Sequence, residues 1–308
     1  MSTKKLSIVR PAFQAATILL VLVLQPGCSK EEQRTRQLDS ADTYLKDGQY
    51  EQARIEYKNL LRDDPQNIRA NFGMGSIWLL QGAPVRAIPF LATADTLSPG
   101  EPEIAMKFAS ALRAVGDIRT ARTKALETLE KSPLHEEALL ILADTARGEE
   151  QIAALEKRLE TLAASPPPTP AYHHASGSLA VRKGNREAAE TSVQAARDLA
   201  PDSFLPYLAL AAMHETRGNL KEAEADLKRA VERSSPRQPP HLGLARFYFR
   251  TDRANDAKLL LEGIQTEAPG YLPPSIELAR IALAADDHDE SARQLEAVLK
   301  ADPSNPDA

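Results

Sequence analysis

The 308-residue chain has little of what several kinds of protein chemistry require. Its only cysteine is Cys28, so an intramolecular disulfide is excluded. Aromatic residues make up 5% of the sequence, which leaves most of the packing to alanine and leucine. The sequence contains no His-Glu-x-x-His, no Gly-x-Ser-x-Gly and no phosphate-binding loop. These absences argue against an enzyme, and we predict no catalytic residue and no cofactor.

Histidines and acids do not form a convincing metal site either. His173 and His174 are adjacent, so they point to different sides of a helix and make a poor ligand pair. The acidic run at residues 286–289 falls in a predicted turn between helices. There an aspartate that caps a helix is favoured over a weak cation site.

The charge balance argues against a nucleic-acid partner. The whole chain carries a formal net charge of −5. Residues 1–27 contain three basic residues and no acid, so their removal brings the net charge to −8. General binding to nucleic acids or anionic lipids through net charge is therefore not expected.

What the sequence does contain is an internal repeat of 34 residues that runs without a slip from Arg34 to Asn305. Eight frames fit this range. The eighth place of each frame holds a small residue: Ala41, Gly75, Ala109, Ala143, Gly177, Ala211, Ala245 and Ala279. The twentieth place holds Ala53, Ala87, Ala121, Leu155, Ala189, Ala223, Ala257 and Ser291.

Each frame predicts two helices and two breaks. Glycine or aspartate at the fifteenth place marks the turn between the helices, because a left-handed conformation costs little there. Proline near the thirty-second place ends the second helix. Small residues on both helices allow a close approach, and a lone pair cannot bury enough apolar surface, so neighbouring pairs must stack. The prediction is an all-α, elongated solenoid.

These residues carry a resemblance to the tetratricopeptide repeat. The two best frames are carried by Ala41, Tyr44, Gly48, Tyr50, Ala53, Tyr57 and Pro65, and by Gly75, Trp78, Gly82, Ala87 and Pro99. The resemblance implies a right-handed superhelical solenoid of about eight helix-turn-helix units. The first helix of each pair would line the concave side. It also implies a non-enzymatic scaffold for protein–protein interactions.

The repeats divide into units 1–4 over residues 34–169 and units 5–8 over residues 170–305, followed by a tail at 306–308. The fourth frame departs most from the pattern. Glu150 replaces the turn glycine, Leu155 replaces alanine, and a proline-rich stretch follows at residues 166–170. We expect looser packing there, with either a bend or a slightly splayed repeat.

The first 27 residues have the features of a secretory signal peptide. A basic head precedes an apolar stretch at residues 11–24, which is shorter than the roughly 20 residues that a spanning helix prefers. Cys28 follows Gly27 and resembles the lipidated cysteine of bacterial lipoproteins, with residues 28–33 as a tether. Ser29 resembles the choice of outer-membrane sorting. An uncleaved membrane anchor and ordinary secretion are the alternatives, because Gln25 and Pro26 depart from the lipoprotein pattern.

The concave face is predicted to bind a partner through arginines interleaved with apolar residues. Arginine suits bidentate capture of carboxylates. The predicted residues are Arg69, Phe72, Arg113, Arg147, Arg182, Arg246, Phe249, Arg250 and Arg280. In the C-terminal half the sequence pattern opposes these arginines with a single acid, Glu215, and Arg246 and Arg280 are expected to face solvent. The alternative is that the arginines form only a solvated helix face.

The favoured function is a lipid-anchored adaptor on the periplasmic side of the outer membrane. It would hold envelope proteins or peptide segments during envelope assembly or exopolysaccharide and protein export. The alternative is an export component whose arginines contact an anionic polysaccharide. The last predicted helix, with Leu295, Val298 and Leu299, lacks a capping unit, so self-association or a partner is expected at this end.

Overall fold

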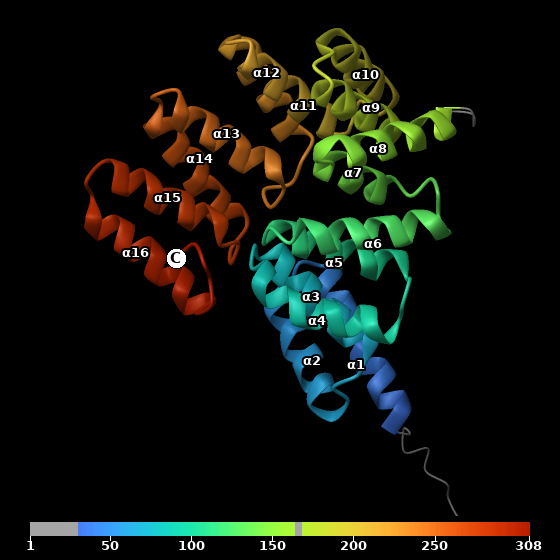
Figure 1. Cartoon of the computed structure of the whole chain (residues 1–308). Helices are drawn as coiled ribbons and strands as arrows, with labels where there is room; N and C mark the ends of the chain where they lie inside the picture. Colours follow the sequence, from blue (N-terminus) through green and yellow to red (C-terminus); the bar gives the residue numbers. More distant parts are fainter. Residues whose placement is uncertain (1–29, 164–167) are drawn as a thin grey trace, which may run out of the picture.

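The computed structural model describes residues 30–163 and 168–308. Within these ranges the chain forms α-helices and no β-strand (Figure 1). The predicted signal segment, Cys28, and residues 166 and 167 of the proline-rich stretch lie outside the described residues. The first helix begins at Lys30, four residues before the first sequence frame.

The described helices follow one another in eight consecutive pairs, so the predicted fold class is confirmed. They are α1 (Lys30–Lys46), α2 (Tyr50–Asp63), α3 (Ile68–Leu80), α4 (Pro84–Leu97), α5 (Pro102–Ala114), α6 (Ile118–Lys131), α7 (Glu136–Thr145), α8 (Gly148–Ala163), α9 (Pro170–Arg182), α10 (Arg186–Leu199), α11 (Leu205–Thr216), α12 (Leu220–Glu232), α13 (Pro239–Arg250), α14 (Ala254–Glu267), α15 (Pro273–Ala284) and α16 (His288–Ala301).

The turns inside the pairs have the backbone conformation that the sequence predicts. The fifteenth-place glycines have positive φ, and so do the two aspartates that replace them, Asp252 at 59° and Asp286 at 56°. Asp287 caps the next helix, because its side chain accepts a hydrogen bond from the backbone nitrogen of Glu290 at 3.0 Å. The acidic run is therefore a capped turn, as predicted.

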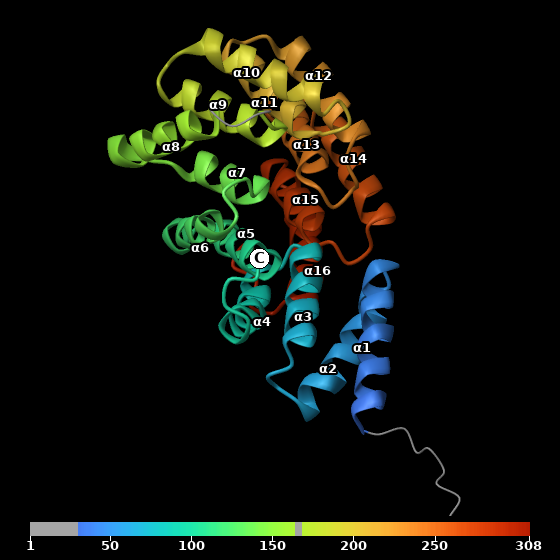
Figure 2. The same cartoon turned by 90° about the vertical axis from the view of Figure 1, so that its right-hand side faces the viewer.

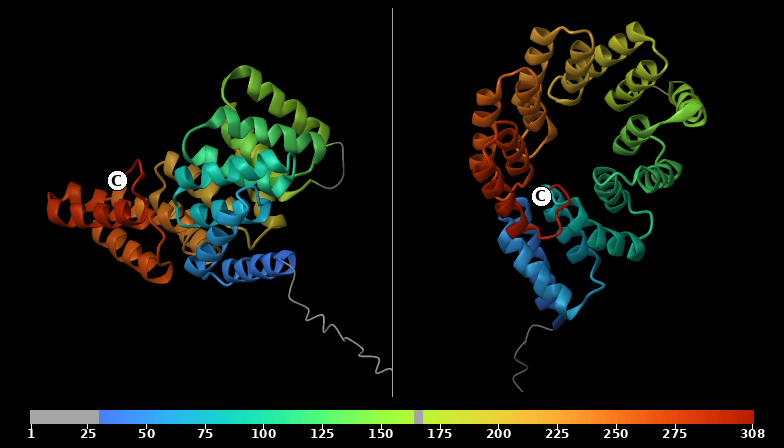
Figure 3. Two further views of the ribbon diagram at one scale, coloured as in Figure 1. Left: turned by 90° about the horizontal axis from the view of Figure 1, so that it is seen from below. Right: turned by 60° about the vertical axis from the view of Figure 1, so that its left-hand side comes forward.

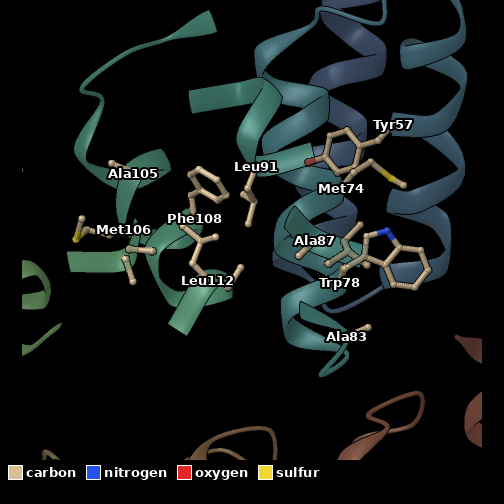
Figure 4. Close-up of a cluster of buried hydrophobic side chains, with 14 of the residues drawn as sticks. Tyr57, Met74, Trp78, Ala83, Ala87, Leu91, Ala105, Met106, Phe108 and Leu112 are labelled. Carbon is tan, nitrogen blue, oxygen red and sulfur yellow. The ribbon is translucent and has the colours of Figure 1, made fainter. Parts of the chain in front are cut away.

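Small residues hold the two helices of each pair together. Every residue at the eighth and twentieth places is buried. At Gly75 a Cβ atom would lie 2.5 Å from Cγ of Leu91, so α3 and α4 touch where a side chain is absent. Around this contact Tyr57, Trp78 and Leu91 fill the space between pairs (Figure 4). The predicted packing scheme is confirmed.

The fourth pair is looser than the others, as expected. Helix α7 has 10 residues, and its backbone approaches α6 and α9 more than α8. The left-handed residue is Gly148, so Glu150 lies in the first turn of α8 and not in the turn between helices. Leu155 occupies the place of alanine, and only Leu155 and Leu159 of α8 are buried. A large residue at the crossing point keeps the axes apart.

The solenoid closes on itself, so the expected elongated shape is wrong (Figures 2 and 3). The C-terminal helices α15 and α16 lie beside α3 and α4 of the second pair. The backbone nitrogen of Leu272 donates to the carbonyl oxygen of Gln81 at 3.0 Å. Leu272, Ile276 and Val298 belong to the same apolar cluster as the N-terminal core.

The expectation that the last helix lacks a cover is wrong for Val298, which is fully buried, although Leu299 stays 38% exposed. The N-terminal half of the same chain supplies contacts that a capping unit would otherwise make. A 34-residue pattern describes one pair and its neighbour, and it contains no information on the pitch that brings the ends together.

Gly75→Ala should lower the free energy of unfolding by about 1–3 kcal/mol, because the added Cβ overpacks the contact with Leu91. The control is Gly263→Ala in α14, where nothing lies within 4 Å of the added atom. That change should stabilise by up to about 1 kcal/mol through helix propensity. Urea unfolding followed by circular dichroism measures both. Equal shifts in the same direction would contradict the packing scheme.

Candidate partner-binding surface

The first helices of the pairs form the inner side of the curved array. Successive first helices contact one another, as α1 does with α3, α7 with α9, and α13 with α15. The predicted partner-binding residues lie on these helices or at their ends, in α3, α5, α9, α13 and α15 and in the turn after α7. The structure separates the arginines among them into four groups with different surroundings.

The C-terminal arginines are already paired. Oε1 of Glu277 accepts hydrogen bonds from Nε and Nη2 of Arg246, at 2.9 and 2.6 Å, and from Nη1 of Arg280, at 3.0 Å. Glu277 is 8% exposed. Arg250 donates to Glu215 at 2.7 Å. This part of the surface is therefore a set of ion pairs and not an unopposed row of cations.

Sequence reasoning missed Glu277, which occupies the sixth place of its frame and is not among the residues predicted to bind a partner on the concave face. The i, i+3 spacing from Arg280 is the signal that could have found it. Arg246 and Arg280 are half exposed, so the expected solvent-facing position is correct only in part.

The N-terminal arginine is paired as well. Arg69 donates to Asp39 at 2.9 Å and to Asp42 at 2.5 Å. The hydroxyl of Tyr57 also donates to Asp42, and burial together with this hydrogen bond raises the pKa of Tyr57. Phe72 is half-buried on the same helix. This arrangement fixes α1, α2 and α3 relative to one another.

Two predicted arginines bind the end of α7. Arg147 Nη1 donates to the carbonyl oxygens of Asp144 and Ala146 at 3.0 and 2.9 Å. Arg182 Nη2 donates to those of Ala143 and Asp144, both at 2.8 Å. Cations suit this position because the unpaired carbonyls of a helix C-terminus carry partial negative charge.

A third arginine at this position was missed by sequence reasoning. Arg122 of α6 donates to the carbonyl oxygen of Leu142 at 3.0 Å. Burial lowers the pKa of Arg182, and the nearby charge of Arg147 lowers it further. Three guanidinium groups therefore converge on one helix end, and their summed charge makes the local potential positive.

Arg113 differs from the rest. It is exposed, and among the described residues it has no hydrogen bond and no ion pair. Its side chain borders a cavity of about 420 Å³ between α5, α7, α9 and α11. The other polar and charged residues at this cavity are Asp144, His174, Ser178, Arg182 and Thr216, and the apolar ones include Val181, Val193 and Met213. Arg113 and Arg182 therefore line the same cavity. Phe249 lies away from it and lines a smaller hollow formed by helices α13 to α16.

Chemistry beyond binding has little support in the described part of the chain. No cluster of histidine, cysteine and acidic residues there has metal-ligand geometry. His174 lies 3.8 Å from Asp144, and His173 packs edge-on against Tyr172, so the two histidines point apart as predicted. Among residues 30–163 and 168–308, no helix has the length and apolar character needed to cross a membrane.

Comparisons with known proteins agree with the repeat. One tetratricopeptide-repeat family model matches residues 38–102, 174–239 and 276–308, and a second matches residues 216–269. No curated protein sequence matches the chain. A solved tetratricopeptide-repeat protein from Parabacteroides merdae superposes with a TM-score of 0.55 at 16% identity, covering 76% of this chain and 93% of its own. A MamA double mutant matches with a TM-score of 0.46 at 18% identity, covering 55% and 94%.

The matched residues make up more than half of the sequence, so the chain belongs to the tetratricopeptide-repeat family. Proteins of this family are generally non-enzymatic, and the fold implies a scaffold for protein–protein interactions.

The double reversal Arg246→Glu/Arg280→Glu should lower the free energy of unfolding by about 3 kcal/mol. It leaves the buried Glu277 carboxylate beside two introduced negative charges, and breaking a buried pair costs roughly 3–5 kcal/mol. Arg113→Glu is the control and should stay within about 0.5 kcal/mol, since no partner is lost. Thermal and urea unfolding measure both variants. Equal stability of the two would show that Glu277 does not depend on its arginines.

Proposed function

We propose that this protein is a lipid-anchored adaptor of the bacterial envelope that faces the periplasm and holds an acidic polypeptide segment on its inner surface. The observation that carries the proposal is Arg113, an exposed cation without a partner beside Arg182 at the central cavity. The other predicted arginines with printed partners are bound to acids or carbonyl oxygens of the chain itself. The central cavity is therefore where a partner's carboxylate has the least competition.

The chemistry of the cavity favours a polypeptide over an anionic polysaccharide. The lining includes the guanidinium groups of Arg113 and Arg182, which suit a carboxylate. It also includes Val181, Val193 and Met213, which suit an apolar side chain. A polypeptide offers both within a few residues, whereas an anionic glycan offers charge and hydroxyl groups. The same combination of apolar pockets and fixed charges recurs in peptide grooves.

The proposed anchor rests on the sequence. Cys28 ends a segment that resembles a lipoprotein signal, and the first helix starts at Lys30. A lipid on Cys28 would place the first pair at the membrane surface. Stable anchoring takes more than one acyl chain, since a single chain binds only marginally. Envelope assembly and exopolysaccharide or protein export are the processes that such an adaptor would serve.

Arg113→Glu should reduce recovery of the envelope partner by about tenfold or more, a loss of about 1.4 kcal/mol, because it turns attraction into repulsion. The measurement is a quantitative pull-down from solubilised envelope. Arg119→Glu on α6 is the matched control, with the same charge change at an exposed site away from the cavity. Met213→Ala distinguishes the partner classes, since it should weaken a polypeptide and spare a polysaccharide. Undiminished recovery with Arg113→Glu would refute the cavity as the binding site.

Cys28→Ser should abolish acylation and move the protein from the membrane to the soluble periplasmic fraction. Metabolic labelling with a fatty-acid analogue and cell fractionation measure the two effects separately. Membrane retention of the unlabelled serine variant would favour an uncleaved anchor. Loss of the wild-type protein to the medium would favour ordinary secretion.

A further inference from the structure

The two ends of the solenoid meet in a seam, which consists of the contacts of Tyr50, residues 80–82 and Arg86 with Arg237, residues 269–273 and residues 301–302. Its central side chain is Arg237. Nη1 of Arg237 donates to the carbonyl oxygen of Leu80 at 2.9 Å, and Nη2 donates to that of Pro269 at 2.8 Å. The same guanidinium lies 4.7 Å from the ring centre of Tyr50 and 5.7 Å from that of Tyr271. One side chain thus joins both halves of the chain.

The remaining seam contacts are also specific. Nη1 of Arg86 donates to the carbonyl oxygen of Ala301 at 2.7 Å, and its Nε lies 4.0 Å from the carboxylate of Asp302, which is fully buried. Leu272 donates to Gln81 across the seam, and both residues are 7% exposed. The contacts are mainly hydrogen bonds and cation–π contacts at helix ends, with a small apolar part.

A glycine permits the closest approach. Gly82 has a φ of +73°, and a Cβ atom placed on it would lie 2.4 Å from Cδ of Pro273. Gly116 occupies the same place of the next pair with a φ of +85°, and nothing lies within 4 Å of its added Cβ. The two glycines therefore share the same backbone requirement, and only Gly82 meets the other half of the chain.

Along the ring, the sparsest backbone contact between neighbouring pairs lies between the fifth pair and the sixth, where α10 meets α11. The apolar core is also divided near this point. One cluster covers the N-terminal pairs up to α7 together with Leu272, Ile276 and Val298, a second covers α7 to α9, and two further clusters cover α11 to α15. No described residue of α10 belongs to these clusters, so motion between α10 and α11 disturbs less apolar packing than motion at the other junctions.

We propose that the seam is a latch and the junction of α10 with α11 a hinge, so that the ring opens as two rigid halves to admit a partner to the inner surface. Separating the halves breaks the polar contacts of the seam and the packing of Leu272, Ile276 and Val298 against the N-terminal core, and it leaves the rest of each half's packing intact. A partner can thread a free chain end along the axis of the closed ring. A partner segment that lies between two folded domains has no free end to thread, so the ring must open before that segment can reach the inner surface. The role in partner entry rests on the proposed function, whereas the latch itself does not.

The first test measures distances by double electron–electron resonance in the chain carrying Cys28→Ser, with cysteine-attached spin labels at exposed residues. Labels on Gln52 and Lys300 measure the distance across the seam. Labels on Gln52 and Arg119 measure a distance within the N-terminal half, and labels on Glu222 and Lys300 measure one within the C-terminal half. Gly82→Ala should lengthen only the distance across the seam, because its Cβ wedges against Pro273. Gly116→Ala should change none of the three.

An unchanged distance across the seam in Gly82→Ala would overturn the latch. Lengthening of all three distances would mean unfolding and would overturn the rigid-body opening. Arg237→Ala gives a second comparison without added strain. Its control is Arg233→Ala, because Arg233 donates to the carbonyl oxygen of Pro201 at 2.9 Å and stacks 4.5 Å from Tyr207 but makes no seam contact. Only Arg237→Ala should lengthen the distance across the seam.

The second test locks the ring with Gly82→Cys/Pro273→Cys in the Cys28→Ser chain. A Cβ on Gly82 lies 2.5 Å from Cγ of Pro273, which places the two Cβ atoms within the roughly 3.5–4.5 Å that a disulfide spans. Oxidation should give a faster-migrating monomer on a non-reducing gel. Absence of this species, or a dimer in its place, would overturn the closed ring.

Once the pull-down has recovered a partner, the oxidised ring should recover about tenfold less of it than the reduced ring, because the entry-competent state is no longer populated. Equal recovery would overturn the role in entry. Failure of the pull-down in the wild-type chain concerns the proposed function alone, since the distance and gel measurements use no partner.

Discussion

Close approach of helix axes at small side chains is the constraint on which the rest of this structure depends. At Gly75 the backbone of α3 meets the side chain of Leu91 with no room for a Cβ atom. Small buried residues at the eighth and twentieth places allow close approach in the other pairs as well, except in the fourth, where Leu155 keeps the axes apart. An isolated pair exposes the remaining apolar stripe, so stability comes from stacking on the neighbours. Curvature and the position of the chain ends follow from the repetition of this one contact.

The sequence predicted the features that each frame determines locally. Left-handed turns at Asp252 and Asp286 follow from residue type, and so does the capping role of Asp287. The looser fourth pair was visible in Leu155 and Glu150, since both break the local rule. These features depend on neighbours within one frame or the next, and a 34-residue pattern contains that information.

Features that depend on distant frames were not predictable in the same way. The contact of Arg237 with Leu80 joins residues 157 positions apart, and its existence depends on the accumulated rotation of the pairs between them. The candidate site was predicted in part. The arginines were placed on the correct helices, but Glu277 was missed, and nothing in the sequence marks Arg113 as the arginine left without a partner.

The paired arginines change how the inner surface would recognise a ligand. A carboxylate that approaches Arg246 must compete with Glu277, which is held in place by burial. At Arg113 no acid of the described residues lies within ion-pair distance, although the carboxylate of Asp144 lines the same cavity. Selectivity along the surface is therefore set by which charges the fold leaves unsatisfied, and less by how many arginines line it.

Closure of the ring also fixes the number of repeats. In an open solenoid, a pair can be duplicated or lost with an approximately additive effect on stability, because each pair contacts only its neighbours. Here Arg237 meets Leu80, and Arg86 meets Ala301, only if the intervening pairs complete the turn. Inserting or deleting one pair would misplace both contacts at once. The number of repeats is therefore constrained by the closure of the ring, which is not the case in an array whose ends never meet.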